Sequence, residues 1–168
     1  ATTLKPMCVI DAMNDYMMNH TSNIHRGDYN SAIKTNELYD DVRSIVSDFV
    51  NCSENEVIYT SGATMSLNMV VFGYMKSHLK KGDEVLLNKA EHASNIIPWI
   101  ILSKQIGIVI KYVPLNDNYE LTLDNIKKCV TDKTRVISLA HVSNVIGDVR
   151  DIEMIGQVCH ENNIIFVV

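Results

Sequence analysis

The chain has 168 residues, a formal net charge of −5 at pH 7, and 46% apolar and 21% charged residues. This length is enough for a domain with a hydrophobic core, and the composition excludes a disordered or low-complexity chain. The net negative charge, without a cluster of lysine and arginine residues, argues against a nucleic-acid partner. The sequence contains no apolar run of the roughly 20 residues that span a bilayer, so we expect no membrane partner.

The four cysteines are too widely spaced for a metal site. Cys8, Cys52, Cys129 and Cys159 form no CxxC pair and no His/Cys cluster with zinc spacing. We therefore predict no metal centre and interpret each cysteine as a small apolar core residue rather than a nucleophile. Widely spaced cysteines also suit a reducing, cytoplasmic location.

The first 50 residues predict two helices joined by a polar loop. The stretch from Pro6 to Met18 reads as the first helix, and residues 20–30 are polar and irregular. A stripe of apolar residues at three- and four-residue steps predicts the second helix. The stripe comprises Leu38, Val42, Ile45, Val46, Phe49 and Val50. We divide the chain into an N-terminal helix and loop segment (1–30) and a partial α/β domain (31–168).

Strands and helices alternate in the rest of the chain. The predicted strands are Val57–Thr60, Val85–Leu87, Ile108–Val113, Arg135–Ala140 and Ile164–Val168. The predicted helices are Ala63–Leu79, Ser94–Gln105, one capped by Thr122 that runs to Val130, and one capped by Asp151 that runs to Glu161. Apolar strands separated by helices predict an α/β fold, with a mostly parallel sheet covered by helices on both faces. Ligands bind such sheets at the carboxyl ends of the strands.

The chain stops at Val168, at the end of a predicted buried strand. Natural termini usually lie at the surface. We therefore expect the chain to be the N-terminal portion of a longer protein.

The turn Tyr59–Thr64 leads from a predicted strand through Gly62 into a helix. Helix N-termini offer free N–H groups and partial positive charge, which bind phosphate, and the Thr64 hydroxyl adds a donor. An ordinary helix cap by Ser61 or Thr64 is the alternative. No GK[ST] sequence follows, which excludes a P-loop.

His92 lies in the loop after the predicted strand Val85–Leu87. An imidazole at this edge could stack on an aromatic ligand or move a proton. The alternative is a solvated or helix-capping histidine.

Two further polar loops contain candidate binding residues. Asn144 follows the predicted strand Arg135–Ala140, where its amide could donate to a phenolate or carboxylate oxygen, and an Asx turn is the alternative. Arg26, in the loop before the second helix, could hold a carboxylate with two hydrogen bonds, and a lone surface arginine is the alternative.

Several motifs, in this order along nearly the whole chain, resemble the SufS-type cysteine desulfurases, which are class V, fold-type I pyridoxal-phosphate enzymes. The most specific is Glu91-His92 followed by Asn95-Ile96-Ile97-Pro98-Trp99, which resembles the family's E-H-H-A-N-I-V-P-W. The others are Ala1-Thr2-Thr3 with Lys5-Pro6, Asn23–Gly27, Tyr39 with Arg43, Ser61–Thr64 with Asn68, Gly82–Glu84 and His141–Gly147. The resemblance implies the large domain of the fold-type I transferases.

The resemblance also implies a cofactor, pyridoxal 5′-phosphate, and roles for particular residues. His92 would stack on the pyridine ring and help to move protons, and Ala63 and Thr64 would hold the phosphate. Asn144 would lie near the phenolic oxygen of the cofactor and the substrate carboxylate. The remaining substrate-binding positions would be Ala1, His25 and Arg26, with the last two near a dimer interface.

The implied reaction converts L-cysteine to L-alanine and an enzyme-bound persulfide for Fe–S cluster assembly. It implies a cytoplasmic homodimer and a sulfur-acceptor protein. The family's Schiff-base lysine, pyridine-nitrogen aspartate and persulfide cysteine would follow Val168, so we expect the isolated chain to be inactive. The alternatives are another class V enzyme, either a selenocysteine lyase or an aminotransferase, or a non-catalytic α/β domain that binds a phosphate-bearing ligand.

The sequence departs from the family pattern at several places. Ala63 replaces a threonine, Ala93 a second histidine and Ser94 an alanine, while Tyr29 stands where many relatives have histidine. The run Gly147–Asp151 differs from the usual G-T-x-N-P. These differences bear on substrate specificity.

Overall fold

A computed structural model describes residues 3–168 and divides them into two compact units, which meet in sequence between Tyr59 and Thr60. The functional division after residue 30 stays a prediction. No helix within the described range is long and apolar enough to cross a membrane.

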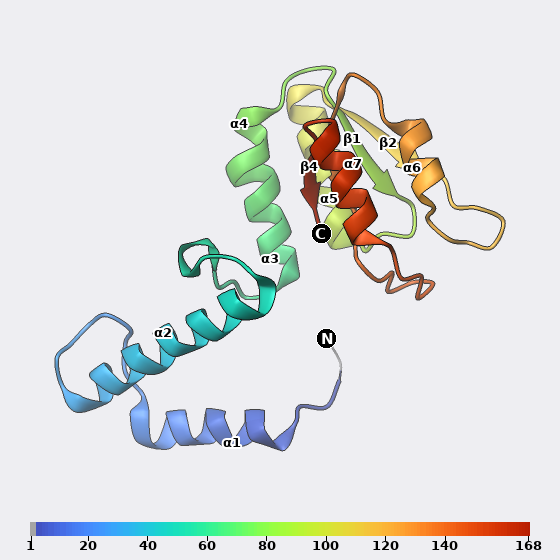
Figure 1. Ribbon diagram of the computed structural model, residues 1–168. Helices are drawn as coiled ribbons and strands as arrows, with labels where there is room; N and C mark the ends of the chain where they lie inside the picture. Colours follow the sequence, from blue (N-terminus) through green and yellow to red (C-terminus); the bar gives the residue numbers. More distant parts are fainter. Residues whose placement is uncertain (1–2) are drawn as a thin grey trace. The chain divides into compact units, whose positions relative to one another are not determined.

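The N-terminal unit is helical (Figure 1). Its elements are α1 (Met7–Asp15), the π-helical turn η1 (Tyr16–His20), α2 (Asn30–Val50) and the 3₁₀ turn η2 (Glu54–Glu56). The hydroxyl of Thr35, on α2, donates to the His20 carbonyl at 2.8 Å and lies 2.7 Å from the Ser22 hydroxyl. These bonds hold the turn after η1 against α2. The two predicted helices are confirmed, although the second begins eight residues before the first residue of the apolar stripe.

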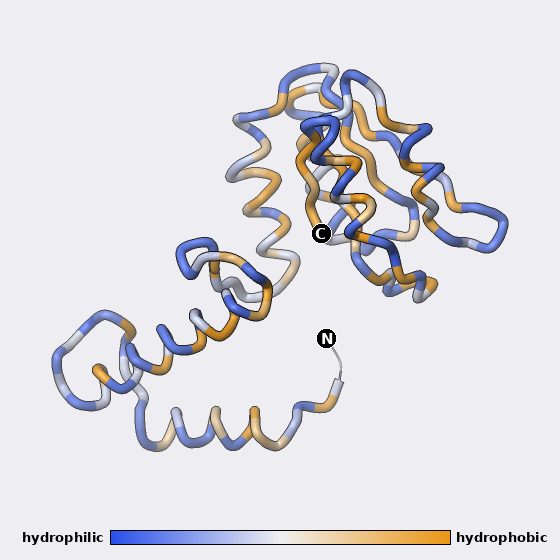
Figure 2. The backbone as a smooth tube through the Cα atoms, in the orientation of Figure 1, coloured by the Kyte–Doolittle hydropathy of each residue, from blue (hydrophilic) through white to orange (hydrophobic). Residues whose placement is uncertain are grey.

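The apolar stripe of α2 is largely exposed within the N-terminal unit. Figure 2 shows apolar positions recurring along this helix. Phe49 is 89% exposed and Ile45 66% exposed.

The C-terminal unit contains a four-stranded parallel sheet (Figure 1). The strands are β1 (Glu84–Asn88), β2 (Val109–Val113), β3 (Thr134–Ser138) and β4 (Ile165–Val167), in the order β2-β1-β3-β4. The helical elements are α3 (Ala63–Asn68), the π-helical η3 (Met69–Met75), α4 (Lys76–His78), α5 (Ala93–Ile106), α6 (Leu123–Cys129) and α7 (Ile152–Glu161). The predicted α/β class and parallel sheet are confirmed.

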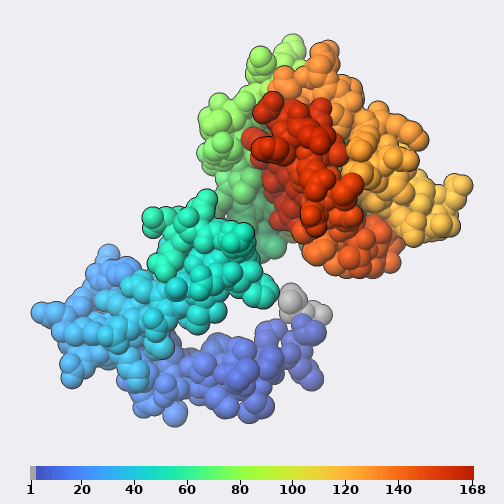
Figure 3. Space-filling view, viewed as in Figure 1, coloured from blue at the N-terminus to red at the C-terminus, as the bar shows by residue number. Residues whose placement is uncertain are grey.

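Two hydrophobic clusters lie on opposite faces of this sheet. Val85 and Leu87 of β1 pack with Trp99 of α5 and with residues of η3, whereas Leu86 packs with residues of α6 and α7. Alternate residues of a strand point to opposite faces, so β1 serves both clusters. All five of its residues are buried. In Figure 3 the red atoms of the C-terminal segment, which include α7, lie on the outside of one face of this unit.

Two predicted helix caps are confirmed. The Thr122 hydroxyl accepts from the Asn125 amide at 3.3 Å, and the Asp151 carboxylate accepts from the Met154 amide at 3.0 Å. Each side chain satisfies one amide in the first turn of its helix.

The strand predicted at Val57–Thr60 is wrong. Residues 57–60 are not part of a strand, and no described strand pairs with them. The Val57 carbonyl instead accepts a hydrogen bond from the Arg43 guanidinium at 3.0 Å. β-branched residues favour an extended backbone, but a strand in a sheet also needs a neighbouring strand to pair with.

Glu84 connects three strands at the start of the sheet. Its carboxylate pairs with Lys111 of β2 at 2.7 Å and accepts from the Thr131 hydroxyl at 2.6 Å. Burial alone would raise the pKa of Glu84, but the hydrogen bonds from Lys111, Thr131 and Thr134 and the charge of Lys111 outweigh burial. The pKa therefore lies below its ordinary value of 4.5.

This depressed pKa predicts acid sensitivity. Ionised Glu84 contributes stability above the unfolded-state value of 4.5, and this contribution is lost as the pH falls through the lower folded-state pKa. We expect Glu84→Gln to be less stable than wild type at neutral pH and the difference to shrink below that value. Unfolding free energies measured by denaturant titration across pH 3 to 7 check this expectation. A constant difference across the range would contradict it.

Candidate functional site

The candidate site lies at the carboxyl ends of β1 and β3, where ligands bind parallel sheets. Asn88, the last residue of β1, donates from Nδ2 to the Val113 carbonyl at the end of β2 at 2.8 Å, and its Oδ1 accepts from the Ala90 amide at 2.7 Å. Asn88 is 1% exposed. A buried amide therefore fixes the end of the strand and the start of the loop that carries His92.

Thr64 and His92 are brought together through Ser94. The Ser94 hydroxyl lies 2.8 Å from Thr64 Oγ1 and 3.0 Å from His92 Nδ1. Thr64 is in the first turn of α3, and Ser94 is in the first turn of α5. The N-termini of these two helices therefore meet, although Thr64 and His92 are 28 positions apart in the sequence.

The first turn of α3 fits an oxyanion. No described residue accepts a hydrogen bond from the amides of Ala63 and Thr64, and both residues are exposed. Two free N–H groups and a hydroxyl form a donor set that suits phosphate oxygens. Neither Ser61 nor Thr64 caps the helix with its side chain. The ordinary cap that the sequence left open is therefore not formed.

His92 caps α5. Its Nδ1 accepts from the Ser94 amide at 3.1 Å, and the residue is otherwise exposed. Because Nδ1 accepts this bond, the proton of the neutral imidazole lies on Nε2. The capping role was one of the alternatives for His92, and it leaves the ring accessible to a ligand.

Asn144 lies in the turn after β3, on an anchored loop. The neighbouring Ser143 is buried and donates from Oγ to the Ala90 carbonyl at 3.1 Å, which joins this loop to the loop that carries His92. The Ser143 hydroxyl also accepts from the amides of Val145 and Ile146 at 3.3 and 3.4 Å. The turn is therefore held by Ser143 rather than by an Asx turn, and the Asn144 side chain is exposed.

A buried ion pair lies beneath both loops. The Glu91 and Arg150 side chains are 0% exposed and bonded to each other. Glu91 also accepts from the Ala140 amide and from Asn95 Nδ2, both at 2.9 Å, while Arg150 donates to the Ala140 carbonyl at 2.9 Å. The Arg150 Nε lies 3.5 Å from the Asp148 carboxylate. Glu91 therefore joins the loop of His92 to the end of β3, and Arg150 joins both to the segment after Asn144.

The other predicted substrate residues lie in the N-terminal unit or outside the described range. His25 and Arg26 are exposed in the loop before α2, where the His25 amide donates to Asn36 Oδ1 at 2.8 Å. Gly27 follows with φ of +139°, and a Cβ there would lie 2.5 Å from the Tyr29 ring, so the close approach requires glycine. Ala1 lies outside the described residues.

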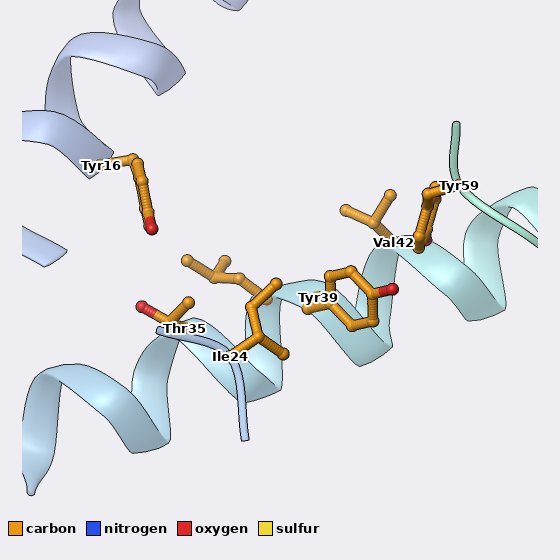
Figure 4. Close-up of a pocket in the computed structure, with 7 residues that line it drawn as sticks. Tyr16, Ile24, Thr35, Tyr39, Val42 and Tyr59 are labelled. Carbon is orange, nitrogen blue, oxygen red and sulfur yellow. The ribbon is translucent and has the colours of Figure 1, made fainter. Parts of the chain in front are cut away.

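The N-terminal unit also contains a pocket of about 300 Å³. Figure 4 shows Tyr39, Val42 and Tyr59 lining it, with Tyr16, Ile24, Thr35 and Leu38 completing the wall. Arg43 lies 5.4 Å from the ring centres of Tyr39 and Tyr59. The lining contains no carboxylate, imidazole or thiol, so this pocket has less chemistry to offer than the edge of the sheet.

Cys159 is buried in the cluster formed with α6 and α7. Burial raises the pKa of its thiol to about 11. A thiol in this state is protonated at neutral pH and is a poor nucleophile. Cys159 is therefore a core residue.

Comparison with known proteins identifies the family. The model of the class V aminotransferase family matches residues 1–168, the whole chain. The chain belongs to this family. This result agrees with the resemblance that the motifs suggested.

Curated class V relatives that are similar to this chain carry the name probable cysteine desulfurase. The protein from Ureaplasma parvum is 41% identical over 155 residues, which are 92% of this chain and 38% of the relative. The protein from Halalkalibacterium halodurans is 33% identical over 169 aligned positions, which are 100% of this chain and 42% of the relative. The chain thus spans about two fifths of the length of these relatives.

Solved structures of class V cysteine desulfurases share the fold. An apo cysteine desulfurase from Thermococcus onnurineus has a TM-score of 0.92 at 28% identity, and the match covers 98% of this chain and 41% of that one. A cysteine desulfurase from Escherichia coli has a TM-score of 0.85 at 28% identity, with 97% and 41% covered.

Reasoning from sequence missed two connecting residues of the site. Ser94 and Arg150 stood out only as departures from the family pattern. The spacing of a histidine two residues before a serine at a helix start could have indicated the cap and its hydroxyl neighbour. Arg150 lies between Val149 and Asp151, a local pattern that does not indicate burial, and its partner Glu91 lies 59 residues away.

Proposed function

We propose that the intact protein is a pyridoxal-phosphate-dependent cysteine desulfurase of the SufS type. It removes sulfur from L-cysteine, releases L-alanine and passes persulfide sulfur to an acceptor protein for Fe–S cluster assembly. It works as a cytoplasmic homodimer. The proposal rests on the Thr64 hydroxyl and two free amides lying close to the His92 imidazole, at the edge of a parallel sheet.

The residues of this chain fit the phosphate and ring of the cofactor. The amides of Ala63 and Thr64, with the Thr64 hydroxyl, bind phosphate oxygens as donors. The absence of a second hydroxyl at Ala63 leaves the phosphate one donor short of the family pattern. His92 presents an exposed imidazole to the ring and, with its proton on Nε2, can donate one hydrogen bond from that atom.

When bound, pyridoxal phosphate supplies an electron-accepting ring that stabilises negative charge on the substrate carbon. Asn144 orients the carboxylate of the substrate and the phenolic oxygen through its amide. The anchored Ser143 holds this turn, so the exposed Asn144 side chain is carried by a rigid backbone. We propose His25, Arg26 and Ala1 as further substrate-binding residues, as the family resemblance implies.

The test uses the intact protein, purified with its cofactor and incubated with L-cysteine and a reductant. We expect equal amounts of alanine and sulfide, measured by amino-acid analysis and a sulfide assay. L-selenocysteine and pyruvate with an amino donor serve as comparison substrates. The absence of alanine from L-cysteine would reject the desulfurase. A strong preference for selenocysteine, or an amino-group transfer, would instead support another activity of class V enzymes.

A further inference from the structure

Ser94 occupies an unusual position between two groups of the proposed site. Its hydroxyl lies 2.8 Å from the Thr64 hydroxyl and 3.0 Å from His92 Nδ1. Its backbone amide donates to the same nitrogen at 3.1 Å. A single side chain therefore connects a candidate phosphate donor to the candidate ring-stacking imidazole. The family pattern has alanine here, so this connection is a feature of the chain itself.

The number of protons limits how these groups bond. Each hydroxyl has one proton to donate. Without an anion, Thr64 can donate to Ser94 while Ser94 donates to His92 Nδ1. A phosphate oxygen only accepts, so Thr64 must turn its proton toward a bound phosphate. The Ser94 hydroxyl can then keep its contact with Thr64 only by donating its own proton to Thr64 Oγ1. In that arrangement it no longer donates to His92 Nδ1.

We infer that Ser94 is a positioning residue that couples phosphate binding at Thr64 to the hydrogen bonding of His92. This inference rests on the proposed function, because it takes Thr64 as a phosphate ligand. The Ser94 amide continues to cap the imidazole in both arrangements. The ring therefore keeps its place while the donor to Nδ1 changes. Phosphate occupancy is thus sensed at the imidazole through the Ser94 hydroxyl.

The experiment follows His92 by nitrogen NMR in the intact protein, freed of cofactor and labelled with ¹⁵N-histidine. The His92 signals are assigned by their loss in His92→Asn. Inorganic phosphate is titrated against sodium chloride of matched ionic strength. We expect a saturable shift of the Nδ1 signal in wild type and its loss in Ser94→Ala. The Kd for phosphate should fall about threefold to tenfold in that variant, because phosphate no longer displaces the hydrogen bond from Ser94 to His92 Nδ1.

Two further variants complete the design. Ser94→Thr keeps a hydroxyl and should restore the shift. Ser103→Ala is a matched control, because Ser103 is on the same helix and its hydroxyl donates to the Ile100 carbonyl at 2.8 Å. It should behave as wild type. An unchanged shift in Ser94→Ala, or no response to phosphate in wild type, would overturn the inference.

The coupling and the proposed function fail in different ways. The NMR titration uses neither pyridoxal phosphate nor cysteine. If the protein shows the coupling but makes no alanine from L-cysteine, the role of Ser94 is supported and the desulfurase activity is rejected. If the protein makes alanine but shows no coupling, the desulfurase activity is supported and the role of Ser94 is rejected.

Discussion

Replacing Arg150 with methionine is expected to lower the free energy of unfolding by about 3–5 kcal/mol, the loss typical when one partner of a buried ion pair is removed. The side chains of Arg150 and Glu91 are both 0% exposed. Methionine fills a similar volume but leaves the Glu91 carboxylate buried without its counter-charge. Urea denaturation of the intact protein, monitored by circular dichroism, measures the loss.

A double variant separates the charge from the packing. In Glu91→Gln with Arg150→Met, no unpaired charge remains, and the glutamine oxygen can still accept from the Ala140 amide or Asn95. We expect it to be more stable than Arg150→Met alone. Arg135→Met is the control, because Arg135 is on the same sheet but its side chain is 43% exposed and lies 3.8 Å from Asp83. It should change stability by about 1 kcal/mol at most. Equal losses in the single and double variants would show that packing, not charge, holds this position.

Replacing His92 with alanine is expected to lower turnover of L-cysteine by about 100-fold to 10,000-fold, the range for losing a group that moves protons in the transition state. The same change removes the cap of α5, so a stability loss of about 0.5–2 kcal/mol accompanies it. Steady-state production of alanine and thermal unfolding of the intact protein measure the two effects separately.

The variant His92→Asn separates the role of His92 in turnover from its role in capping α5. Asparagine is among the best capping residues, so it should restore the stability of α5, but it has no imidazole and should remain as slow as His92→Ala. His160→Ala is the control, since His160 is exposed in the last turn of α7. It should turn over cysteine at the wild-type rate. Wild-type turnover in His92→Asn would leave His92 only its capping role.

Local sequence patterns predicted most of the fold of the C-terminal unit. The apolar strands Val85–Leu87 and Arg135–Ala140, and the caps at Thr122 and Asp151, depend on neighbours in sequence and were found within a few residues of their bounds. Residues 57–60 look similar locally and form no strand. The difference lies in the partner strand, which no window of a few residues contains. The π-helical turns at Tyr16–His20 and Met69–Met75 likewise have no distinct local pattern.

The candidate residues of the site were proposed from the sequence, but the contacts that connect them were not. His92 and Asn144 follow predicted strands that the structure contains, so topology assigned them to one edge of the sheet. The strand predicted before Thr64 does not form, and Thr64 reaches this edge through its contact with Ser94. The links beneath them join residues far apart in sequence. Ser94 contacts Thr64 across 30 residues, and Arg150 contacts Glu91 across 59 residues. Such contacts depend on the register of the sheet, which the sequence pattern leaves open.

The buried amide of Asn88 has a consequence for how this segment evolves. Asn88 attaches the end of one strand to its neighbour, and Asn95, seven positions later, is attached to Ser138 at 2.6 Å. The intervening backbone is therefore tethered at both ends, and its length is set by the span between the tethers. The exposed side chains of Lys89 and Ala93 are free to diverge, whereas gaining or losing a residue would swing the imidazole away from the helix it begins. Natural divergence in this stretch should therefore appear as exchanges of residue type and not as changes in length.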